Sequence, residues 1–303
     1  VNYETEKKGR PRFIPQLRTW GTLPKLDCHT VLNRSTRADL RGGAGAVTLA
    51  VNAGTRKFST IPTISPAHRT MTTSRKLIAI EGIDGSGKRT QVELLEDALA
   101  SRGHQTFVTG FPIYDSWFGA MVGKFLDGGF GPLEEVDPQL TALLYAGDRF
   151  EAKKQLVDAL AAGKIVLADR YVGSNLAHQA ARVAAPARAE FVKWIEHLEY
   201  GIYGLPRESA IIYLRVPPLE AQKLVGRKST RGYTAATHDL LEENLRHLED
   251  AAAMYDELAK RENWIRVECF DSSAHSIRPP NAIAEEILTA VETVLAETRG
   301  ENS

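Results

Sequence analysis

A glycine-rich segment that contains a lysine, residues 77–90, constrains the fold of this chain more than any other feature. It reads LIAIEGIDGSGKRT, so Gly82, Gly87 and Lys88 have the spacing G-x-x-x-x-G-K. An apolar, strand-like run precedes it and a helical pattern follows it, which is the context in which this spacing forms a phosphate-binding loop. Glycines let consecutive backbone N–H groups converge on an anion, and the following helix adds its positive N-terminal end. The segment therefore predicts a nucleoside triphosphate site.

The loop departs from the usual pattern at one position. Arg89 stands where a serine or threonine normally offers a hydroxyl to Mg²⁺, and Thr90 lies about 100° further round the helix. We expect Mg²⁺ to rely instead on Asp84, Asp169, water and the phosphates, since this ion needs few protein ligands. Lys88 supplies a point charge for the β- and γ-phosphates. The predicted ATP-binding residues of the loop are Gly82, Ile83, Asp84, Gly85, Ser86, Gly87, Lys88, Arg89 and Thr90.

Downstream of the loop, short apolar runs alternate with long amphipathic stretches. The expected strands are LIAIEG, TFVTG, IVLAD, AIIYLRV and WIRVECF. The expected helical regions are 88–102, 116–162, 173–200, 218–262 (interrupted by a loop) and 281–297. Strands separated by helices imply parallel strands joined by right-handed crossovers. The sequence thus predicts a three-layer α/β P-loop NTPase fold, with a five-stranded parallel sheet covered by helices.

Residues 1–70 differ in composition from the rest. They hold 12 Lys and Arg against 4 Asp and Glu, which leaves 26 against 34 for the other 233 residues. They lack sustained periodicity, so we expect them to be a disordered extension, or upstream sequence before a start at Met71. A targeting peptide and a basic arm that binds nucleic acid are the alternatives. The expected P-loop domain is residues 71–303.

The remaining composition fits a cytoplasmic globular protein. Cys28 and Cys269 are the two cysteines, which argues against a disulfide framework or a thiolate metal site. No apolar stretch approaches the roughly 20 residues that cross a bilayer. We therefore expect no membrane partner, and no nucleic-acid partner for the folded domain.

Four motifs, the phosphate-binding loop and three further ones, resemble those of thymidylate kinases over residues 76–297. The loop itself reads EGIDGSGKRTQ, and Phe111 to Tyr114 match the family's F-P-x-Y. LLYAGDRF is similar to the family's aromatic-x-x-D-R helix, and the third strand ends in DRYVGSN, like D-R-Y-x-x-S-N. The resemblance implies phosphorylation of dTMP to dTDP by ATP with Mg²⁺, and a homodimer that pairs through helices.

The same resemblance implies roles at the acceptor site. Arg170 would hold the acceptor phosphate, Arg149 the base and its surroundings, and Phe111 could stack on the pyrimidine. His178 stands where many relatives have Tyr or Phe, which leaves the strictness of deoxyribose selectivity open. The predicted substrate-binding residues are Phe111, Tyr114, Tyr145, Arg149, Arg170, Ser174, Asn175 and His178.

The stretch GRKSTRG, between two helical patterns, resembles the lid that closes over ATP in this superfamily. Arg227 and Arg231 are its candidate ATP contacts. Phosphoryl transfer needs in-line positioning and charge neutralisation, without a general base, because the acceptor phosphate is already ionised. The predicted catalytic residues are Asp84, Lys88, Asp169 and Arg170, and the predicted metal ligands are Asp84 and Asp169.

Two other functions stay open on the sequence alone. A deoxynucleoside kinase or a kinase for another monophosphate would share this fold, although the former typically has E-R-S where this chain has D-R-Y. An inactive nucleotide-binding homologue, weakened at Arg89, belongs to a different functional class.

Overall fold

The computed structural model describes residues 76–225 and 245–300. The expectations for residues 1–70, including a start at Met71, therefore fall outside the described residues. So do the predicted lid and its arginines, Arg227 and Arg231.

A five-stranded sheet forms the centre of the fold, and every neighbouring pair of its strands is parallel. Its order is β2-β3-β1-β4-β5, so β1 is central and all five of its residues are buried. The predicted parallel sheet is confirmed. The strands are β1 (Leu77–Glu81), β2 (Thr106–Gly110), β3 (Ile165–Asp169), β4 (Ala210–Arg215) and β5 (Trp264–Glu268).

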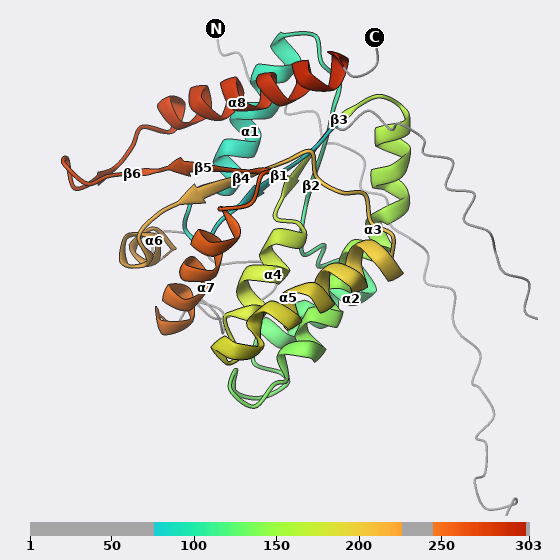
Figure 1. Ribbon diagram of the computed structural model, residues 1–303, viewed down its shortest axis with the longest axis vertical. Helices are drawn as coiled ribbons and strands as arrows, with labels where there is room; N and C mark the ends of the chain where they lie inside the picture. The colour runs from blue at the N-terminus through green and yellow to red at the C-terminus, as the bar shows by residue number, and fades with distance from the viewer. Residues whose placement is uncertain (1–75, 226–244, 301–303) are drawn as a thin grey trace, which may run out of the picture. The chain divides into compact units, whose positions relative to one another are not determined.

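Helices cover both faces of this sheet, with α1 and α8 on one face and α4 and α7 on the other (Figure 1). The α-helices are α1 (Lys88–Ser101), α2 (Trp117–Leu126), α3 (Pro138–Ala161), α4 (Val172–Ala180), α5 (Arg188–Glu196), α6 (Pro218–Val225), α7 (Leu245–Leu258) and α8 (Pro280–Gly300). Two shorter turns are η1 (Ala185–Ala187) and the π-helical η2 (His197–Ile202). All nine residues of α4 are buried, since this helix packs against β1, α3, α5 and α7.

The helical boundaries differ from the predictions in one region. The helical region expected over 116–162 consists of two helices, α2 and α3, which pack on each other and are separated by a non-helical segment. Between them the chain turns at Gly128 and Gly131, both with positive φ, a conformation that glycine adopts without strain. Asp137 then caps the N-terminus of α3, because its carboxylate accepts the backbone N–H of Gln139 at 2.6 Å.

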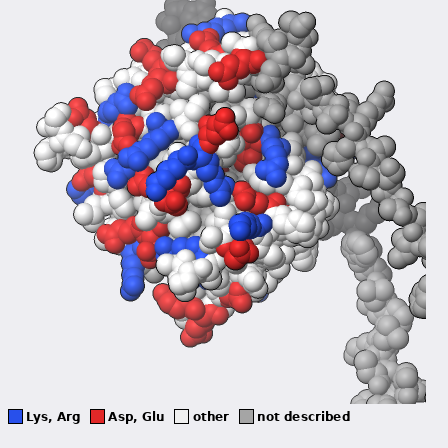
Figure 2. Space-filling model, in the orientation of Figure 1, with Lys and Arg blue, Asp and Glu red and all other residues white. Residues whose placement is uncertain are grey.

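A small antiparallel ribbon was not predicted. It consists of β6 (Phe270–Asp271) and β7 (Ser276–Ile277) and joins β5 to α8. Among the described residues, no helix is long and apolar enough to span a bilayer. On the face that Figure 2 presents, basic and acidic side chains are intermixed.

Candidate active site

The phosphate-binding loop connects β1 to α1 at the carboxyl edge of the sheet. Gly85 has φ 84°, and a Cβ there would lie 2.1 Å from the carbonyl oxygen of Ala221 in α6. A side chain cannot be accommodated at this position, because the obstacle is backbone. Lys88 is buried and donates to the carbonyls of Gly82 at 3.0 Å and Ile83 at 2.9 Å. The loop is thus closely packed, with its lysine turned inward along it.

Burial alters the ionisation of this lysine. Desolvation, with a further contribution from the positive charge of Arg170, lowers the pKa of Lys88 from 10.5 to about 8. The next two residues lie on the outer face of α1: Arg89 is exposed and ion-paired with Glu93 at 3.0 Å, and Thr90 is also exposed. Their predicted ATP contacts stay predictions.

Arg170 links the loop to the acceptor side. It follows β3 with φ 67°, a left-handed conformation that costs a non-glycine residue about 1–2 kcal/mol. Its Nη2 donates to Asp84 Oδ1 at 2.6 Å, and its Nη1 donates to the Gly82 carbonyl at 3.2 Å and to Ser174 Oγ at 3.0 Å. Strain of this kind is often retained at functional sites. The guanidinium group is held beside the phosphate-binding loop.

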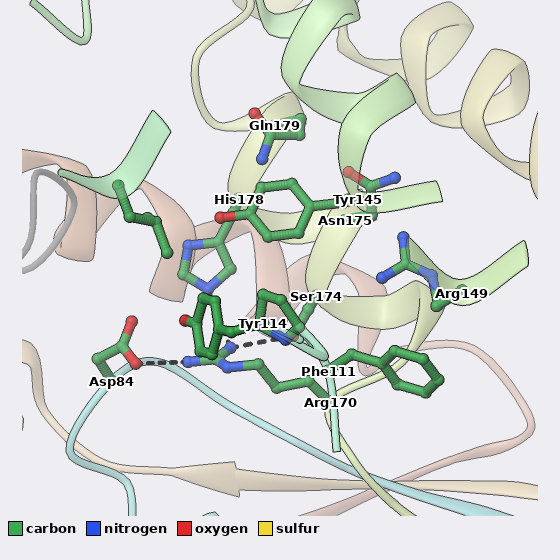
Figure 3. Close-up of a pocket in the computed structure, with 12 residues that line it drawn as sticks. Asp84, Phe111, Tyr114, Tyr145, Arg149, Arg170, Ser174, Asn175, His178 and Gln179 are labelled. Carbon is green, nitrogen blue, oxygen red and sulfur yellow. Dashed lines mark hydrogen bonds and ion pairs between the residues drawn. The ribbon is translucent and has the colours of Figure 1, made fainter. Parts of the chain in front are cut away.

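A pocket opens next to this guanidinium group (Figure 3). The structure brings all eight predicted acceptor residues into its wall, together with Asp84 of the loop. Aromatic rings form one part of the lining and polar side chains of α4 another. The lining residues are Asp84, Phe111, Pro112, Tyr114, Leu126, Tyr145, Arg149, Arg170, Ser174, Asn175, His178 and Gln179.

Asp148 of α3 binds the segment that carries the pocket aromatics Phe111 and Tyr114. Its carboxylate accepts the backbone N–H of Ile113 at 3.1 Å and the hydroxyl of Ser116, also at 3.1 Å. Asp148 is fully buried, and desolvation raises its pKa above the usual value for an aspartate. The aspartate of the D-R pair therefore positions the segment that carries Phe111 and Tyr114.

Arg149, the other member of the pair, is held by a residue that the sequence did not indicate. Its Nε and Nη2 both donate to the carboxylate of Glu199, each at 2.6 Å, and both side chains are almost fully buried. Asn175 donates to the same carboxylate at 2.7 Å and to the Ala142 carbonyl at 3.1 Å. Asn175 Oδ1 is buried with no hydrogen-bond partner in the described part of the chain.

A second buried carboxylate, Glu81, ties β1 to α4 and α7. It accepts the backbone N–H groups of Tyr171 at 2.7 Å and Ser174 at 3.0 Å, and thereby satisfies two backbone donors at the N-terminus of α4. It also accepts the hydroxyls of Ser174 at 2.6 Å and Tyr255 at 2.9 Å. Because Ser174 Oγ in turn accepts a hydrogen bond from Arg170, Glu81 helps to position Arg170 through Ser174.

His178 meets a second histidine at the far side of the pocket wall. Its Nε2 faces Arg170 Nη1 at 3.4 Å, and its Nδ1 lies 3.2 Å from Nε2 of His247 in α7. Both rings are buried. Desolvation lowers the pKa of His178 well below its usual value, and lowers the pKa of His247 to about 4.

Comparison with known proteins identifies the family. The thymidylate kinase family model matches residues 80–275. A thymidylate kinase of Mycobacterium tuberculosis is 33% identical over 188 residues, which cover 60% of this chain and 85% of the relative. The chain belongs to the thymidylate kinase family. It is accordingly a transferase, a kinase that uses ATP.

A second relative and a solved structure are also thymidylate kinases or probable thymidylate kinases. A probable thymidylate kinase of Pyrococcus abyssi is 33% identical over 172 residues, 54% of this chain and 75% of the relative. The solved structure of thymidylate kinase from Candida albicans covers 72% of this chain and 91% of its own, with a TM-score of 0.57 and 20% identity. At that identity the likeness supports the fold.

The carboxylates of this thymidylate kinase family member fit a sparsely ligated Mg²⁺. Asp84 in the loop and Asp169 at the end of β3 flank Arg170, and Asp84 accepts a hydrogen bond from it. Among the described residues, no group of three or more His, Cys, Asp or Glu side chains could hold a metal ion. Magnesium in kinases is usually held by one or two carboxylates, water and substrate phosphates, and this arrangement fits that pattern.

Several residues of the site were missed from the sequence. Gln179 lies one turn after Asn175 on α4, and this helical spacing could have indicated it. Glu81 directly precedes the loop, but nothing in the motif assigned it a contact. Glu199 and His247 belong to segments without a recognisable motif, so no sequence signal pointed to them.

Proposed function

We propose that this kinase transfers the γ-phosphate of ATP to dTMP, giving dTDP and ADP. The observation that carries the proposal is the position of Arg170. This residue lines the acceptor pocket and donates to Asp84 and to the Gly82 carbonyl of the phosphate-binding loop. An acceptor phosphate on Arg170 would therefore face the γ-phosphate of an ATP bound in that loop. The names of the relatives point to the same acceptor.

The polar groups deep in the pocket support a thymine base. Asn175 offers the acceptor Oδ1, and Arg149 Nη1, which makes no hydrogen bond to the described residues, offers a donor. A donor beside an acceptor complements the C4 carbonyl and N3–H of thymine or uracil. Cytosine presents the opposite order, and a buried polar mismatch of this kind is costly. Phe111 and Tyr145 supply aromatic surface for the flat ring.

In the reaction, an oxygen of the acceptor phosphate attacks the γ-phosphorus while the bond to the β–γ bridging oxygen breaks. The electron pair of that bond leaves with ADP. Arg170 holds the attacking phosphate, Lys88 and the N-terminus of α1 hold the donor phosphates, and Asp84 keeps the two sites together. Mg²⁺, the proposed cofactor, would neutralise phosphate charge and would be held through Asp84 and Asp169.

An acceptor panel tests the proposal. Purified full-length chain is incubated with ATP, Mg²⁺ and one of dTMP, dUMP, UMP, dCMP, CMP or thymidine, and ADP release is followed. We expect the highest kcat/KM with dTMP. Turnover of thymidine with none of dTMP would replace the proposal by a deoxynucleoside kinase. Saturable ATP binding with no acceptor turned over would indicate an inactive homologue.

We also propose that the enzyme is a cytoplasmic homodimer that pairs through α3. Four apolar side chains on this helix are exposed at spacings of three and seven residues, namely Leu140, Leu143, Phe150 and Val157. Such a stripe on one helix is typical of a helix-to-helix interface. The cytoplasmic assignment is supported by the buried free thiol of Cys269 and is tested by cell fractionation.

A further inference from the structure

Glu199 lies outside the wall of the acceptor pocket but controls two of its polar groups. It belongs to the π-helical turn η2, which directly follows α5, and its side chain is fully buried. Turns of this kind within helices often occur at functional sites, because the extra residue redirects a side chain. Here the carboxylate reaches Arg149 on α3 and Asn175 on α4, two helices that both border the pocket.

The first consequence concerns Asn175. An amide side chain can rotate to exchange its donor and acceptor, so its orientation has to be set by its partners. Both partners of Nδ2, the Glu199 carboxylate at 2.7 Å and the Ala142 carbonyl at 3.1 Å, can only accept. The NH₂ group must therefore face them. Oδ1 is left as the buried group without a partner among the described residues.

The second consequence concerns Arg149. Glu199 binds Nε and Nη2 in a two-point contact, with both distances 2.6 Å. A bidentate ion pair fixes the plane of a guanidinium group as well as its position. Nη1 is then the nitrogen available to the pocket, where it can only donate. One carboxylate thus sets a donor on one pocket residue and an acceptor on its neighbour.

We infer that Glu199 is a positioning residue that sets the base selectivity of this enzyme, by fixing the donor–acceptor order that Arg149 and Asn175 present to the pyrimidine. The inference rests on the proposed function, in which these two side chains meet the base. A carboxylate is required because three N–H groups converge on it, and a glutamine would turn its own NH₂ toward at least one of them. With the carboxylate gone, only the Ala142 carbonyl still orients the Asn175 amide, so its rotation becomes easier, and Arg149 loses its fixed plane.

The test compares Glu199→Gln with a matched control, Glu208→Gln. Glu208 is also a buried glutamate of this region, but its contact is the Tyr200 hydroxyl at 2.7 Å and it does not line the pocket. Values of kcat and KM are measured for dTMP, dUMP and dCMP at saturating ATP. Far-UV circular dichroism and urea unfolding report whether each variant is folded.

For Glu199→Gln we expect the ratio of kcat/KM for dTMP over dCMP to fall by about tenfold or more. The loss should lie mainly in KM for dTMP, because the phosphate groups are positioned by other residues. The ratio for dTMP over dUMP should stay within about twofold, since these bases share the carbonyl and N–H edge. Glu208→Gln should leave both ratios unchanged.

A folded Glu199→Gln enzyme with an unchanged dTMP to dCMP ratio overturns the inference. If burying Arg149 without a counter-charge prevents folding, Glu199→Asp replaces it, because it keeps the charge but is too short to hold both partners. A folded Glu199→Asp enzyme with the wild-type ratio is then the overturning result. Failure of the proposed function is distinguishable, since it would appear in the wild type as a lack of turnover of dTMP.

Discussion

Nδ1 of His178 and Nε2 of His247 lie 3.2 Å apart, so a buried contact between two imidazoles joins α4 to α7. The direction of this hydrogen bond follows from the neighbouring group. Arg170 Nη1, which can only donate, faces Nε2 of His178 at 3.4 Å. We therefore assign the His178 proton to Nδ1, which donates to an unprotonated Nε2 of His247. Both rings are neutral in this arrangement, and it links the acceptor arginine to the helix that follows residues 226–244.

Replacing His247 by alanine should destabilise the protein. The change leaves the Nδ1–H group of His178 buried without its acceptor and creates a small cavity. A lost buried hydrogen bond of this type costs about 1–3 kcal/mol of the free energy of unfolding. Urea unfolding at pH 7.5 measures it, with His104→Ala as a control because the His104 side chain is half-buried and makes no hydrogen bond to the described residues. Equal losses in the two variants would contradict the assigned contact.

The same pair makes stability depend on pH. Desolvation depresses the folded-state pKa of both histidines below the unfolded value of 6.5, so the unfolded chain binds more protons below that pH. The free energy of unfolding should fall as the pH drops from about 6.5 toward 4, by up to about 1.4 kcal/mol per pH unit for each ring. A His178→Phe, His247→Leu variant should show a shallower fall. Parallel curves for variant and wild type would exclude this source.

The wild type has to be compared with this double histidine variant, because another buried group changes the free energy of unfolding with pH in the opposite direction. Desolvation raises the pKa of Glu208 from 4.5 to about 7. Its contribution to stability is fully present below pH 4.5 and is lost as the pH rises through 7. Wild type and histidine variant share this contribution, so it cancels in their difference.

Much of the fold could be predicted because its signals are local. Each strand of the sheet is a short apolar run, and the glycine spacing fixed where β1 ends and α1 begins. The ribbon of β6 and β7 was missed since strands of two residues have no periodicity. The break between α2 and α3 was not predicted. The glycines at 128, 129 and 131 indicate it, but helical patterns on both sides obscure this signal.

The candidate site also has a part that could be predicted from the sequence and a part that could not. Residues such as Phe111 and Arg170 directly follow strands whose carboxyl ends share one edge, so their proximity follows from topology. The partners of these residues do not follow from it. Glu199 is 50 positions from Arg149 and reaches it through a π-helical turn, while His247 meets His178 from another helix. Such contacts depend on packing between distant elements, which no motif records.

ATP binding should weaken above pH 8. The pKa of Lys88 is lowered to about 8, chiefly by desolvation, so the charged form that attracts phosphate is present below this pH and lost above it. We expect the Kd for ATP to rise between pH 8 and 9.5, approaching tenfold per pH unit in the limit of one required proton. Isothermal titration measures it. A Lys88→Arg variant should give a flatter profile, and the same rise in both proteins would contradict the assignment.

Removing the Arg170 side chain should abolish most activity with dTMP. We expect Arg170→Ala to lower kcat/KM for dTMP by a factor that corresponds to about 2–5 kcal/mol, since a charge-assisted contact to the acceptor is lost. Arg170→Gly should be equally inactive yet about 1 kcal/mol more stable than Arg170→Ala, because φ is 67° at this position. The exposed Arg102→Ala serves as the control. Retention of wild-type kcat/KM by Arg170→Ala would remove this residue from the acceptor site.

The apolar stripe on α3 predicts the oligomeric state. Phe150 is at its centre and contacts the ring of Tyr203, with the centroids 4.8 Å apart. If a second copy covers the stripe, Phe150→Glu buries an unpaired charge in the interface and should convert a dimer into a monomer. Leu219→Glu is the matched control, because this exposed leucine lies on α6, away from the stripe. Sedimentation velocity at micromolar protein should therefore give the mass of two chains for wild type and Leu219→Glu, and of one for Phe150→Glu. A dimer that survives Phe150→Glu would place the interface elsewhere, and a monomeric wild type would rule out pairing through α3.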